Sequence, residues 1–509
     1  MCAYNAINGQ PACANQFLLE HTLRGAWGFQ GYVVSDCGAV RDIFNGHRYR
    51  PTQPQASAIS LQRGMDNECA DFFTKVKDDH DYRPYIEAVQ QGYLSEGAID
   101  TALVRLFTAR VRLGMFDPPS MVPYSKADPS QLNSAAHREL ARRLADESMV
   151  LLKNDGVLPL KSSVKRIAVV GPLADQTAVL LGNYNGIPTH TVSVLEGMKA
   201  EFPGAEITYV PGTQFLSKRG TPVSSEPDPA AVAAAKNADV VIAVVGITSR
   251  LEGEEMHVSQ PGFLGGDRTN LMMPQPEEDL VQAVAAAGKP LVVVLMNGSA
   301  LAVNWEKTHA NAILEAWYSG EEGGAAIAET LSGKNNPAGR LPVTFYKGVE
   351  QLPHFEDYSM EGRTYRYFKG EPLWPFGYGL SYTTFNYSDL TLPSAPVKAG
   401  DPLDLSVTVT NTGNLTGDEV VELYLKFPEV AGAPIRALRG FQRIHLEAGG
   451  NQVVKFHLQP RDLSMVTEDG NIIVAQGKYT VSAGGGQPET GVSSVSGGFE
   501  IRGQIMLPE

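Results

Sequence analysis

Two stretches of the chain combine acidic side chains with the local structure that a catalytic carboxylate needs. The first is Asp36, which ends the strand-like run of residues 31–35 and is followed by Cys37 and Gly38. A carboxylate at the C-terminal end of a buried parallel strand occupies the position where α/β barrels carry catalytic groups. Burying such a group is costly unless it has a partner. An Asp after a strand is also an ordinary helix N-cap, so Asp36 alone leaves both roles open.

The second stretch is an acidic loop that follows the apolar run of residues 240–245. Glu252, Glu254 and Glu255 surround Gly253, which makes the stretch a poor helix and a poor strand. In open α/β sheets the ligand crevice forms at the carboxyl ends of the strands, where this loop begins. A long loop with a glycine can reach toward a neighbouring domain. Most clusters of Glu, however, are solvated surface loops, and this stretch alone is weak evidence.

A pair of carboxylates is the requirement of glycoside hydrolysis. One is ionised and attacks the anomeric carbon, while the other protonates the leaving oxygen and later acts as base on water. In a retaining enzyme the two carboxyl groups lie about 5–5.5 Å apart. We therefore expect Asp36 and one glutamate of the 252–255 loop to meet at a shared sugar pocket.

Several motifs, in the same order along the chain, resemble glycoside hydrolase family 3 over the entire length. They lie at residues 1–9, 11–15, 31–36, 64–68, 251–256, 266–268, 336–342 and 375–382. The resemblance implies a retaining, exo-acting β-glycosidase that releases terminal β-D-glucosyl or β-D-xylosyl residues through a covalent glycosyl-aspartate intermediate. Its substrates would be oligosaccharides or aryl and alkyl β-glycosides.

The same resemblance implies roles for individual residues. Asp36 would be the nucleophile, and Tyr4 would donate a hydrogen bond to its carboxylate and lower its pKa. Glu254 would be the general acid/base, with Glu252 and Glu255 as alternatives, because the acid loops of the family vary in length. Tyr4 is also compatible with an ordinary core position, since buried tyrosines usually find a hydrogen-bond partner.

Cys37 bears on which sugar is accepted. Many β-glucosidases of the family have Trp directly after the nucleophile, as part of the sugar platform. A Cys at this position resembles the pattern of β-xylosidases and some bacterial glucosidases. The sequence therefore leaves glucosides and xylosides both open, and Cys37 is a candidate substrate-binding residue together with Tyr4, Glu252 and Glu255.

Other acidic and basic residues near these motifs are expected to be structural. Asp267 and Arg268 are expected to fix the acidic loop as a bidentate pair. Glu321 and Glu322 follow another strand-like run and are expected to support the fold rather than the chemistry.

The pattern of apolar residues predicts an α/β plus all-β fold. Strand-like runs alternate with helical ones up to about residue 348, and period-two strands follow after about residue 382. The expected helices are residues 56–63, 84–91, 96–113, 135–151, 229–236 and 277–287, and the expected strands are 31–35, 166–170, 238–245, 290–296, 403–410, 419–426, 452–458 and 478–483. Together with the resemblance, this pattern predicts five parts of the chain. They are the C-terminal strands of a TIM-like (β/α) barrel (1–115), a linker (116–145), an (α/β)6 sandwich (146–348), a connecting segment (349–381) and a fibronectin type III-like domain (382–509).

The resemblance also predicts that part of the barrel lies outside this chain. The family's barrel begins well upstream of its nucleophile, and the upstream part carries residues that hold the terminal sugar. Residues 1–115 account for about three of eight barrel strands, and three strands cannot close. We expect glycosidase activity to need the missing half. The alternative function is a non-catalytic carbohydrate-binding or scaffold remnant of such an enzyme.

Composition excludes several other classes. The formal net charge of −14 at neutral pH argues against nucleic acid as a partner. No apolar run reaches the roughly 18 residues of a membrane span, and the residues imply no metal or organic cofactor.

Cys2, Cys13, Cys37 and Cys69 are the four cysteines, and we expect them to be reduced and buried, with a Cys2–Cys13 disulfide as the alternative. The compartment stays open, although the family is often secreted or periplasmic.

Overall fold

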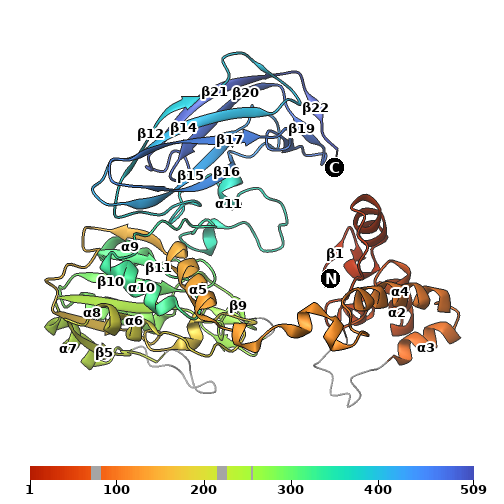
Figure 1. Ribbon diagram of the computed structural model, residues 1–509, viewed down its shortest axis with the longest axis horizontal. Coiled ribbons are helices and arrows are strands. Elements are labelled where there is room, and N and C mark those ends of the chain that lie inside the picture. Colours follow the sequence, from red (N-terminus) through yellow and green to blue (C-terminus); the bar gives the residue numbers. More distant parts are fainter. Residues whose placement is uncertain (70–81, 215–225, 254–255, 509) are drawn as a thin grey trace. The chain divides into compact units, whose positions relative to one another are not determined.

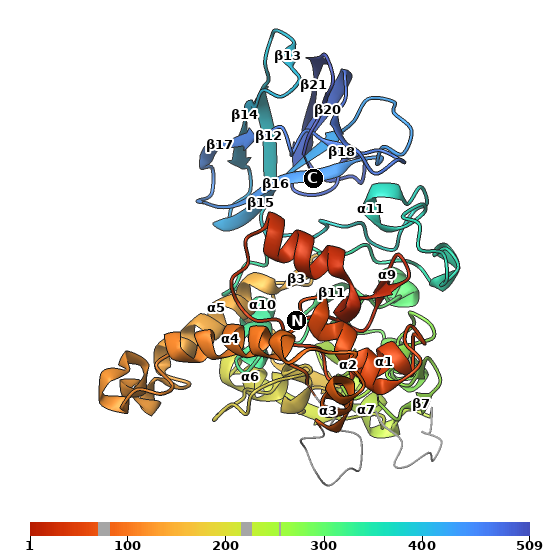
Figure 2. The ribbon, with the colours of Figure 1, turned by 90° about the vertical axis from the view of Figure 1, so that its right-hand side faces the viewer.

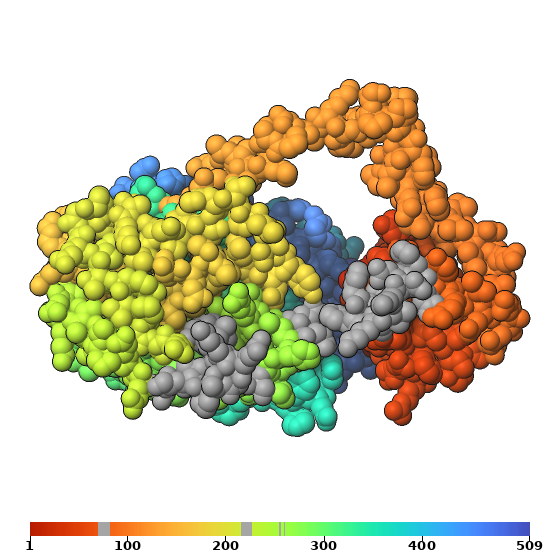
Figure 3. Space-filling model, turned by 90° about the horizontal axis from the view of Figure 1, so that it is seen from below, coloured from red at the N-terminus to blue at the C-terminus, as the bar shows by residue number. Residues whose placement is uncertain are grey.

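The computed structural model describes residues 1–69, 82–214, 226–253 and 256–508 of the 509-residue chain. The chain forms two compact units, Met1–Gln131 and Leu132–Glu509, and each is described here by itself (Figure 1). The boundary between them lies inside the predicted linker. Residues 119–131 consist of short 3-10 turns, η3 (Pro119–Met121), η4 (Pro123–Lys126) and η5 (Pro129–Gln131), along a thin stretch of chain that is visible in Figure 3.

The first unit is organised around three parallel chain segments. Cys2 pairs with Ser35 and Val34 pairs with Asn67, both in parallel. The amide of Asp36 donates to Cys2 O at 2.8 Å, and the amide of Ser35 donates to Asn67 O at 2.8 Å. The segment before Asp36 therefore lies between the other two, as a buried parallel strand should. Its ladder is limited to single bridges at Val34 and Ser35 and does not extend over all of residues 31–35.

Helices surround these segments in the first unit. They are a π-helix η2 (Phe17–Ala26) and the α-helices α1 (Ala39–Phe44), α2 (Gln53–Gln62), α3 (Arg83–Gln90) and α4 (Glu96–Arg112). The expected N-cap of α4 is confirmed, because the Ser95 side chain accepts a hydrogen bond from the Ala98 amide. The only fully buried residue of α4 is Ala102, and large apolar side chains such as Val104 and Phe107 stay exposed.

Two disulfides link the segments of the first unit, which corrects the expectation of reduced cysteines. Cys2 is bonded to Cys13, and Cys37 is bonded to Cys69. The first bond is the alternative that the sequence left open, and the second joins residues that are 32 positions apart. Sequence spacing does not give disulfide connectivity, and here neighbouring strands bring distant cysteines together.

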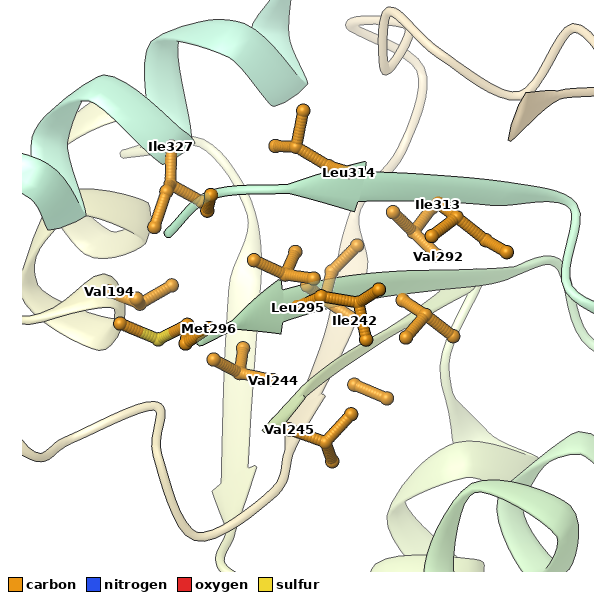
Figure 4. Packing of buried hydrophobic residues seen from close by; sticks show 14 of the residues in the cluster. Val194, Ile242, Val244, Val245, Val292, Leu295, Met296, Ile313, Leu314 and Ile327 are labelled. Carbon is orange, nitrogen blue, oxygen red and sulfur yellow. The ribbon is translucent and has the colours of Figure 1, made fainter. Parts of the chain in front are cut away.

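A six-stranded sheet forms the core of the second unit. Its strand order is β3 (Val150–Asn154), β11 (Ala312–Glu315), β10 (Leu291–Met296), β6 (Val240–Gly246), β4 (Arg166–Val170) and β5 (Glu206–Val210). All neighbours are parallel except β3, which is antiparallel to β11. β6, β10 and β11 are buried along their whole length, with side chains such as Val244, Leu295 and Ile313 packed on each other (Figure 4).

Helices connect and cover the strands of this sheet. They are α5 (Ala135–Ser148), α6 (Val194–Glu201), α7 (Pro229–Asn237), α8 (Gln275–Ala285), α9 (Asn304–His309) and α10 (Gly323–Ser332). The expected helix of residues 135–151 is wrong at its end, because α5 stops at Ser148 and Val150 already begins β3. An apolar run of this kind suits a buried helix or a strand, and pairing with β11 decides for the strand.

The C-terminal region is a β-sandwich, shown with its layers separated in Figure 2. One sheet has the order β12 (Phe385–Thr391), β14 (Leu403–Asn411) and β17 (Asn451–Leu458), and the other has β13 (Val397–Lys398), β21 (Ser494–Arg502), β20 (Gly477–Gly484), β15 (Gly417–Lys426) and β16 (Ala437–Leu446). A small third sheet joins β18 (Met465–Val466), β19 (Ile472–Val474) and β22 (Ile505–Met506). The four predicted strands of this region are confirmed, while β12, β16 and β21 were not predicted.

A buried ion pair joins the sandwich to the α/β sheet. Arg340 donates to Glu419 at 2.6 Å and to Gly485 O at 3.0 Å, and the side chains of Arg340 and Glu419 are almost fully buried. Tyr387 donates to the other oxygen of Glu419 at 2.6 Å. Within the described ranges, no helix has the length and apolar character needed to cross a bilayer.

Candidate active site

Asp36 lies at the end of the central segment of the first unit, directly before helix α1. It is half-buried, and its Oδ1 accepts a hydrogen bond from the amide of Cys37 at 2.8 Å. Its own carbonyl accepts from the amide of Ala39 at 3.1 Å. The backbone of Asp36 is thus held on both sides, and the carboxylate keeps part of its surface free for a ligand. A half-buried carboxylate at a strand end is suited to act as a nucleophile.

Asp66 is the residue that holds this strand in place. Its Oδ2 accepts from the Val33 amide at 2.8 Å and from Arg24, while its Oδ1 accepts from Arg105 at 3.1 Å. The Asp66 side chain is completely buried. It therefore ties η2 and α4 to the segment that carries Asp36, and two arginines compensate its charge as a buried carboxylate requires.

Tyr4 does not donate to the Asp36 carboxylate as expected. Its hydroxyl donates to the carbonyl oxygen of Cys37, the next residue along the chain, and its own carbonyl lies 2.6 Å from Nε2 of His47. A hydroxyl has one proton to donate, and the backbone of Cys37 takes it. Tyr4 therefore fixes the turn after Asp36. The physical reason is that the carbonyl of Cys37, left outside the regular ladder, needs a donor.

Cys37 is half-buried and bonded to Cys69. The position directly after Asp36 is thus a disulfide rather than a free thiol. The Gly38 amide donates to Cys69 O at 3.1 Å, which fixes the same turn a second time. A proposed contact of residue 37 with a sugar would be made by the disulfide and its backbone.

The acidic loop of the second unit begins at the end of β6. Gly246 has φ +142°, and a Cβ there would lie 2.1 Å from Met296 O, so only glycine lets the chain leave the sheet at this point. Farther along, β7 (Ser259–Gln260), β8 (Phe263–Leu264) and β9 (Asp267–Arg268) form a small antiparallel sheet. Glu254 and Glu255 lie outside the described residues, so their predicted roles stay predictions.

Glu252 is the described acidic residue of the loop, and its carboxylate is held by three donors. The Gly298 amide donates to Oε1 at 2.8 Å, the Tyr318 hydroxyl donates to Oε1 at 2.7 Å, and the Ser299 hydroxyl donates to Oε2. A Cβ on residue 298 would lie 2.8 Å from Oε1, so a glycine is required for this approach. These donors come from the ends of β10 and β11, and they anchor the loop to the carboxyl edge of the sheet.

Arg268 and Tyr318 complete the electrostatic surroundings of Glu252. Burial lowers the pKa of Arg268, and the nearby Glu252 opposes that shift. Burial, followed by the charge of Glu252, raises the pKa of Tyr318 well above its ordinary value. Tyr318 therefore stays a neutral hydrogen-bond donor at every physiological pH.

Glu315, at the end of β11, is a fully buried acid next to this cluster. Burial raises its pKa to about 8, against the hydrogen bonds from Asn297 and the Trp317 amide, while Glu252 raises it further. Asn297 Nδ2 donates to Glu315 Oε2 at 3.1 Å. Glu315 thus lies at the same sheet edge as Glu252, and its burial favours the protonated form of Glu315.

Two other expectations concern charged residues near the loop. The expected Asp267–Arg268 pair is wrong. Arg268 donates instead to Ser299 Oγ at 3.0 Å and to Ala300 O at 2.8 Å, because neighbouring residues in an antiparallel strand point to opposite faces. Glu322, by contrast, is buried and paired with Arg138 of α5, as a structural residue should be.

Sequence reasoning missed the residues that position Glu252 and Asp36. Tyr318 and Ser299 are 66 and 47 positions from Glu252, and Arg24 is 42 positions from Asp66. The only available signal was topological, since residues directly after β10 and β11 must lie beside residues after β6 in a parallel sheet.

Three regions of the chain match known families. Residues 1–109 match the glycosyl hydrolase family 3 N terminal domain, residues 149–382 match the glycosyl hydrolase family 3 C-terminal domain, and residues 419–487 match a fibronectin type III-like domain. These matches agree with the order of domains expected from the motifs.

Curated relatives are xylosidases and glucosidases. A xylan 1,4-β-xylosidase of Xylanibacter ruminicola is 32% identical over 95% of this chain and 71% of its own length. A periplasmic β-glucosidase of Salmonella typhimurium is 37% identical over 95% of this chain and 65% of its own length. The chain therefore spans about two thirds of the length of such relatives.

Solved structures give the same result. The match to an exo-β-xylosidase in complex with a xylobiose aziridine activity-based probe has a TM-score of 0.87 and 30% identity. It covers 100% of this chain and 67% of the xylosidase chain. The match to a β-glucosidase of Erythrobacter marinus has a TM-score of 0.83 and 35% identity. It covers 98% of this chain and 67% of the glucosidase chain.

Proposed function

The chain belongs to glycoside hydrolase family 3, and from that membership we propose that it supplies the catalytic carboxylates of a retaining, exo-acting β-glycosidase. The substrate would carry a terminal β-D-glucosyl or β-D-xylosyl residue. In the proposed mechanism Asp36 attacks the anomeric carbon and the leaving oxygen takes a proton from Glu254. Water then attacks the glycosyl-aspartate, and Glu254 accepts its proton.

The observation that carries the proposal is the position of Asp36. It ends the central one of three parallel segments and is half-buried. Backbone bonds join it to Cys2 and Ala39, and the Cys37 amide donates to its carboxylate. This is the strand-end position at which barrel enzymes carry catalytic groups. Asp66 is also in the neighbourhood, but both its oxygens are taken by Arg24, Arg105 and Val33, which leaves Asp36 as the acid with room for substrate.

A covalent label tests the nucleophile directly. The chain is expressed as it is and, in parallel, extended by any in-frame coding sequence that precedes Met1, and both are treated with xylose- and glucose-configured aziridine probes. We expect peptide mass spectrometry to find the label on Asp36, and Asp36→Asn to lower turnover of aryl β-glycosides by at least about 10³-fold. A label on another residue, or unchanged turnover in Asp36→Asn, contradicts the assignment.

The acid/base is distinguished by its dependence on the leaving group. General acid catalysis contributes about 10²–10⁴-fold, so Glu254→Gln should slow hydrolysis of xylobiose or cellobiose by that order. Aryl glycosides with an acidic phenol need no protonation, and their glycosylation step should be slowed much less. Glu252→Gln and Glu255→Gln are the matched controls. We place Glu252 among the positioning residues because three donors hold it. A leaving-group-dependent loss in Glu255→Gln instead of Glu254→Gln would move the role to Glu255.

The choice between glucoside and xyloside needs a paired assay. Relatives of both kinds match the chain to a similar extent, and the ratio of kcat/KM for aryl β-D-xyloside and aryl β-D-glucoside on the active form decides it. We propose that activity needs further barrel strands. The three parallel segments have two edges without a strand partner among the described residues, and apolar side chains such as Val104 and Phe107 are exposed. Robust turnover by this chain alone would overturn that part.

A second candidate function, a non-catalytic carbohydrate-binding remnant, predicts no turnover and no label in either form.

A further inference from the structure

The second unit contains a cavity of about 890 Å³ between three parts of its chain. Its wall is made by α9 of the sheet region, by the connecting segment that includes α11 (Thr364–Tyr367), and by two loops of the β-sandwich. Figures 1 and 2 show α11 in the space between the sheet and the sandwich. The volume falls within the range of about 300–1,000 Å³ that small-molecule sites occupy.

Two buried oxygen atoms in this wall, Oγ1 of Thr344 and Oε1 of Gln487, have no hydrogen-bond partner among the described residues. Gln487 is 7% exposed, and its amide oxygen is the unpartnered atom. Thr344 is 8% exposed, with an unpartnered hydroxyl. Trp374 is 3% exposed, and its indole N–H donates to no described residue. Buried groups of this kind are normally satisfied, and each one left open costs about 1–3 kcal/mol.

The cations around the cavity are each paired, held by a carbonyl or exposed to solvent, which favours a neutral ligand. Arg436 pairs with Glu489 at 3.3 Å, and the Lys307 ammonium lies 5.1 Å from the centre of the Trp374 ring while it donates to Leu373 O. Glu371, at the exposed rim, pairs with Lys347 at 3.1 Å. An anion would have to compete with Glu489 for Arg436 and with the Leu373 carbonyl for Lys307, while the third lining cation, Lys369, is exposed to solvent.

Apolar rings supply the rest of the wall. Phe368 and Tyr365 are half-buried and line the same cavity as Trp374. A site with aromatic walls and a few convergent polar groups takes ligands that have both apolar and hydroxylated faces. A sugar has such faces, with C–H groups on one side of the ring and hydroxyls around its edge.

We propose that this cavity is a second carbohydrate-binding site, separate from Asp36 and its chemistry, that takes a neutral mono- or disaccharide. Trp374 supplies a donor, Gln487 a donor and an acceptor, and Thr344 a hydroxyl that can do either. Phe368 and Tyr365 provide apolar surface for the ring. Binding here requires no bond to be made or broken, so this site can be occupied whether or not the chain hydrolyses glycosides.

Fluorine NMR can follow ligand binding in the cavity separately from events in the unit that carries Asp36. The chain has four tryptophans, Trp27, Trp305, Trp317 and Trp374, so 5-fluorotryptophan labelling gives four signals, and Trp374→Phe assigns the one in the cavity. The full chain with Asp36→Asn, which prevents turnover, is titrated with xylobiose, cellobiose and inorganic phosphate. We expect xylobiose or cellobiose to shift the Trp374 signal saturably and phosphate to leave it unchanged.

A double variant tests whether the polar groups of the wall do the binding. Thr344→Val with Gln487→Met keeps the volumes similar and should weaken the disaccharide effect on Trp374 at least tenfold. It should not lower the melting temperature of the ligand-free chain, because it removes groups that have no partner. The matched control, Thr384→Val with Gln442→Met, makes the same chemical changes on the sandwich, where Thr384 is exposed and Gln442 is half-buried, and should bind as the parent does. If the double variant does not fold, Gln487→Met alone gives the same comparison.

Three results overturn the inference. The first is no saturable shift of the Trp374 signal with either disaccharide, which would leave the cavity as a water-filled gap. The second is an equal shift with phosphate, which would make the ligand class wrong. The third is unchanged disaccharide affinity in the double variant. None of them bears on covalent labelling of Asp36, so this site and the proposed function fail independently.

Discussion

At the level of single residues, Glu252 shows how a carboxylate in a catalytic loop can serve position rather than proton transfer. Its oxygens accept from Gly298, Ser299 and Tyr318, so its charge is already solvated by the protein. A general acid must keep its proton available to substrate. Glu254 and Glu255 lie outside the described residues, and the proposed role of Glu254 as the acid rests on its place in the sequence motif.

Tyr318→Phe measures how firmly Glu252 is held. It removes one hydrogen bond to a charged group and should lower the free energy of unfolding by about 1.5–3 kcal/mol. Hydrogen exchange of residues 247–253 should become faster, because the loop loses one of three anchors. Tyr378→Phe is the control, since the Tyr378 hydroxyl is bonded to no described residue. Equal exchange in Tyr318→Phe and the parent would show that Glu252 does not anchor the loop.

Glu315 predicts a pH dependence of stability. Its pKa is about 8 in the folded protein and near 4.5 in the unfolded chain. Between these values the folded state binds more protons than the unfolded state, so the free energy of unfolding falls as pH rises from about 4.5 to 8. Glu315→Gln lacks this slope. Each unit of pKa difference corresponds to about 1.4 kcal/mol, so the variant should gain stability relative to the parent by some kcal/mol across the window.

Denaturant unfolding of the parent and Glu315→Gln at several pH values between 5 and 8 checks this. Glu306 also has a pKa raised by burial to about 8, but it is present in both proteins and cancels in the difference. A stability difference that does not change with pH would mean that Glu315 is ionised in the fold.

At the level of elements, the disulfides concentrate in the first unit. All four cysteines of the chain form Cys2–Cys13 and Cys37–Cys69, within residues 1–131. The first bond joins the segment that pairs beside Asp36 to the turn at residues 12–14, and the second fixes the turn after Asp36. The small apolar core of this unit makes such cross-links more important than in the second unit.

Reduction should therefore destabilise one unit only. Each disulfide of this kind contributes about 2–4 kcal/mol, so a phosphine reductant should lower the melting transition of residues 1–131 and leave that of residues 132–509 unchanged. Calorimetry with and without reductant measures both transitions in one sample. A chain with all four cysteines changed to Ala should respond as the reduced protein does and be insensitive to reductant. Transitions that both shift, or that both stay, would contradict this.

The elements that sequence predicts well are those whose signals are local. Strands at residues 166–170 and 290–296 are mostly apolar runs rich in β-branched residues, and the helix at 96–113 has its own cap at Ser95, so neighbouring residues suffice. β16 was missed because Gly440 and several polar side chains interrupt its alternation. β3 was taken as helix because only its pairing with β11 selects the strand.

The candidate site also has a part that local sequence patterns predict and a part that they do not. Asp36 is recognisable because an apolar run ends in a carboxylate, which is a local pattern. The Cys37–Cys69 bond, the Glu252 anchors and the Asp66 partners join residues from 32 to 66 positions apart, and such pairs depend on how the strands are ordered in space. The order of residues along the chain does not tell which of these distant residues come into contact.

At the level of the whole molecule, Arg340 links the two folded regions of the second unit. It lies after the sheet region and is bonded to Glu419 of β15 and to the carbonyl of Gly485, while Tyr387 holds the other oxygen of Glu419. The pair is almost fully buried, so its charges have no access to water. A buried pair of this kind gives orientation more than stability, but removing one partner leaves an uncompensated charge.

Arg340→Met should therefore weaken the joint more than either region. We expect a loss of about 3–5 kcal/mol, because Glu419 would stay buried without its cation, and calorimetry should resolve the sheet region and the sandwich as separate transitions. The double variant Arg340→Met with Glu419→Gln removes both charges and should recover much of the loss, with Tyr387 still able to donate to the amide oxygen. The cavity beside Trp374 is formed by these same two regions, so the single variant should also weaken disaccharide binding there, and the double variant should restore it. A single cooperative transition at the parent temperature in Arg340→Met would show that other contacts hold the sandwich in place.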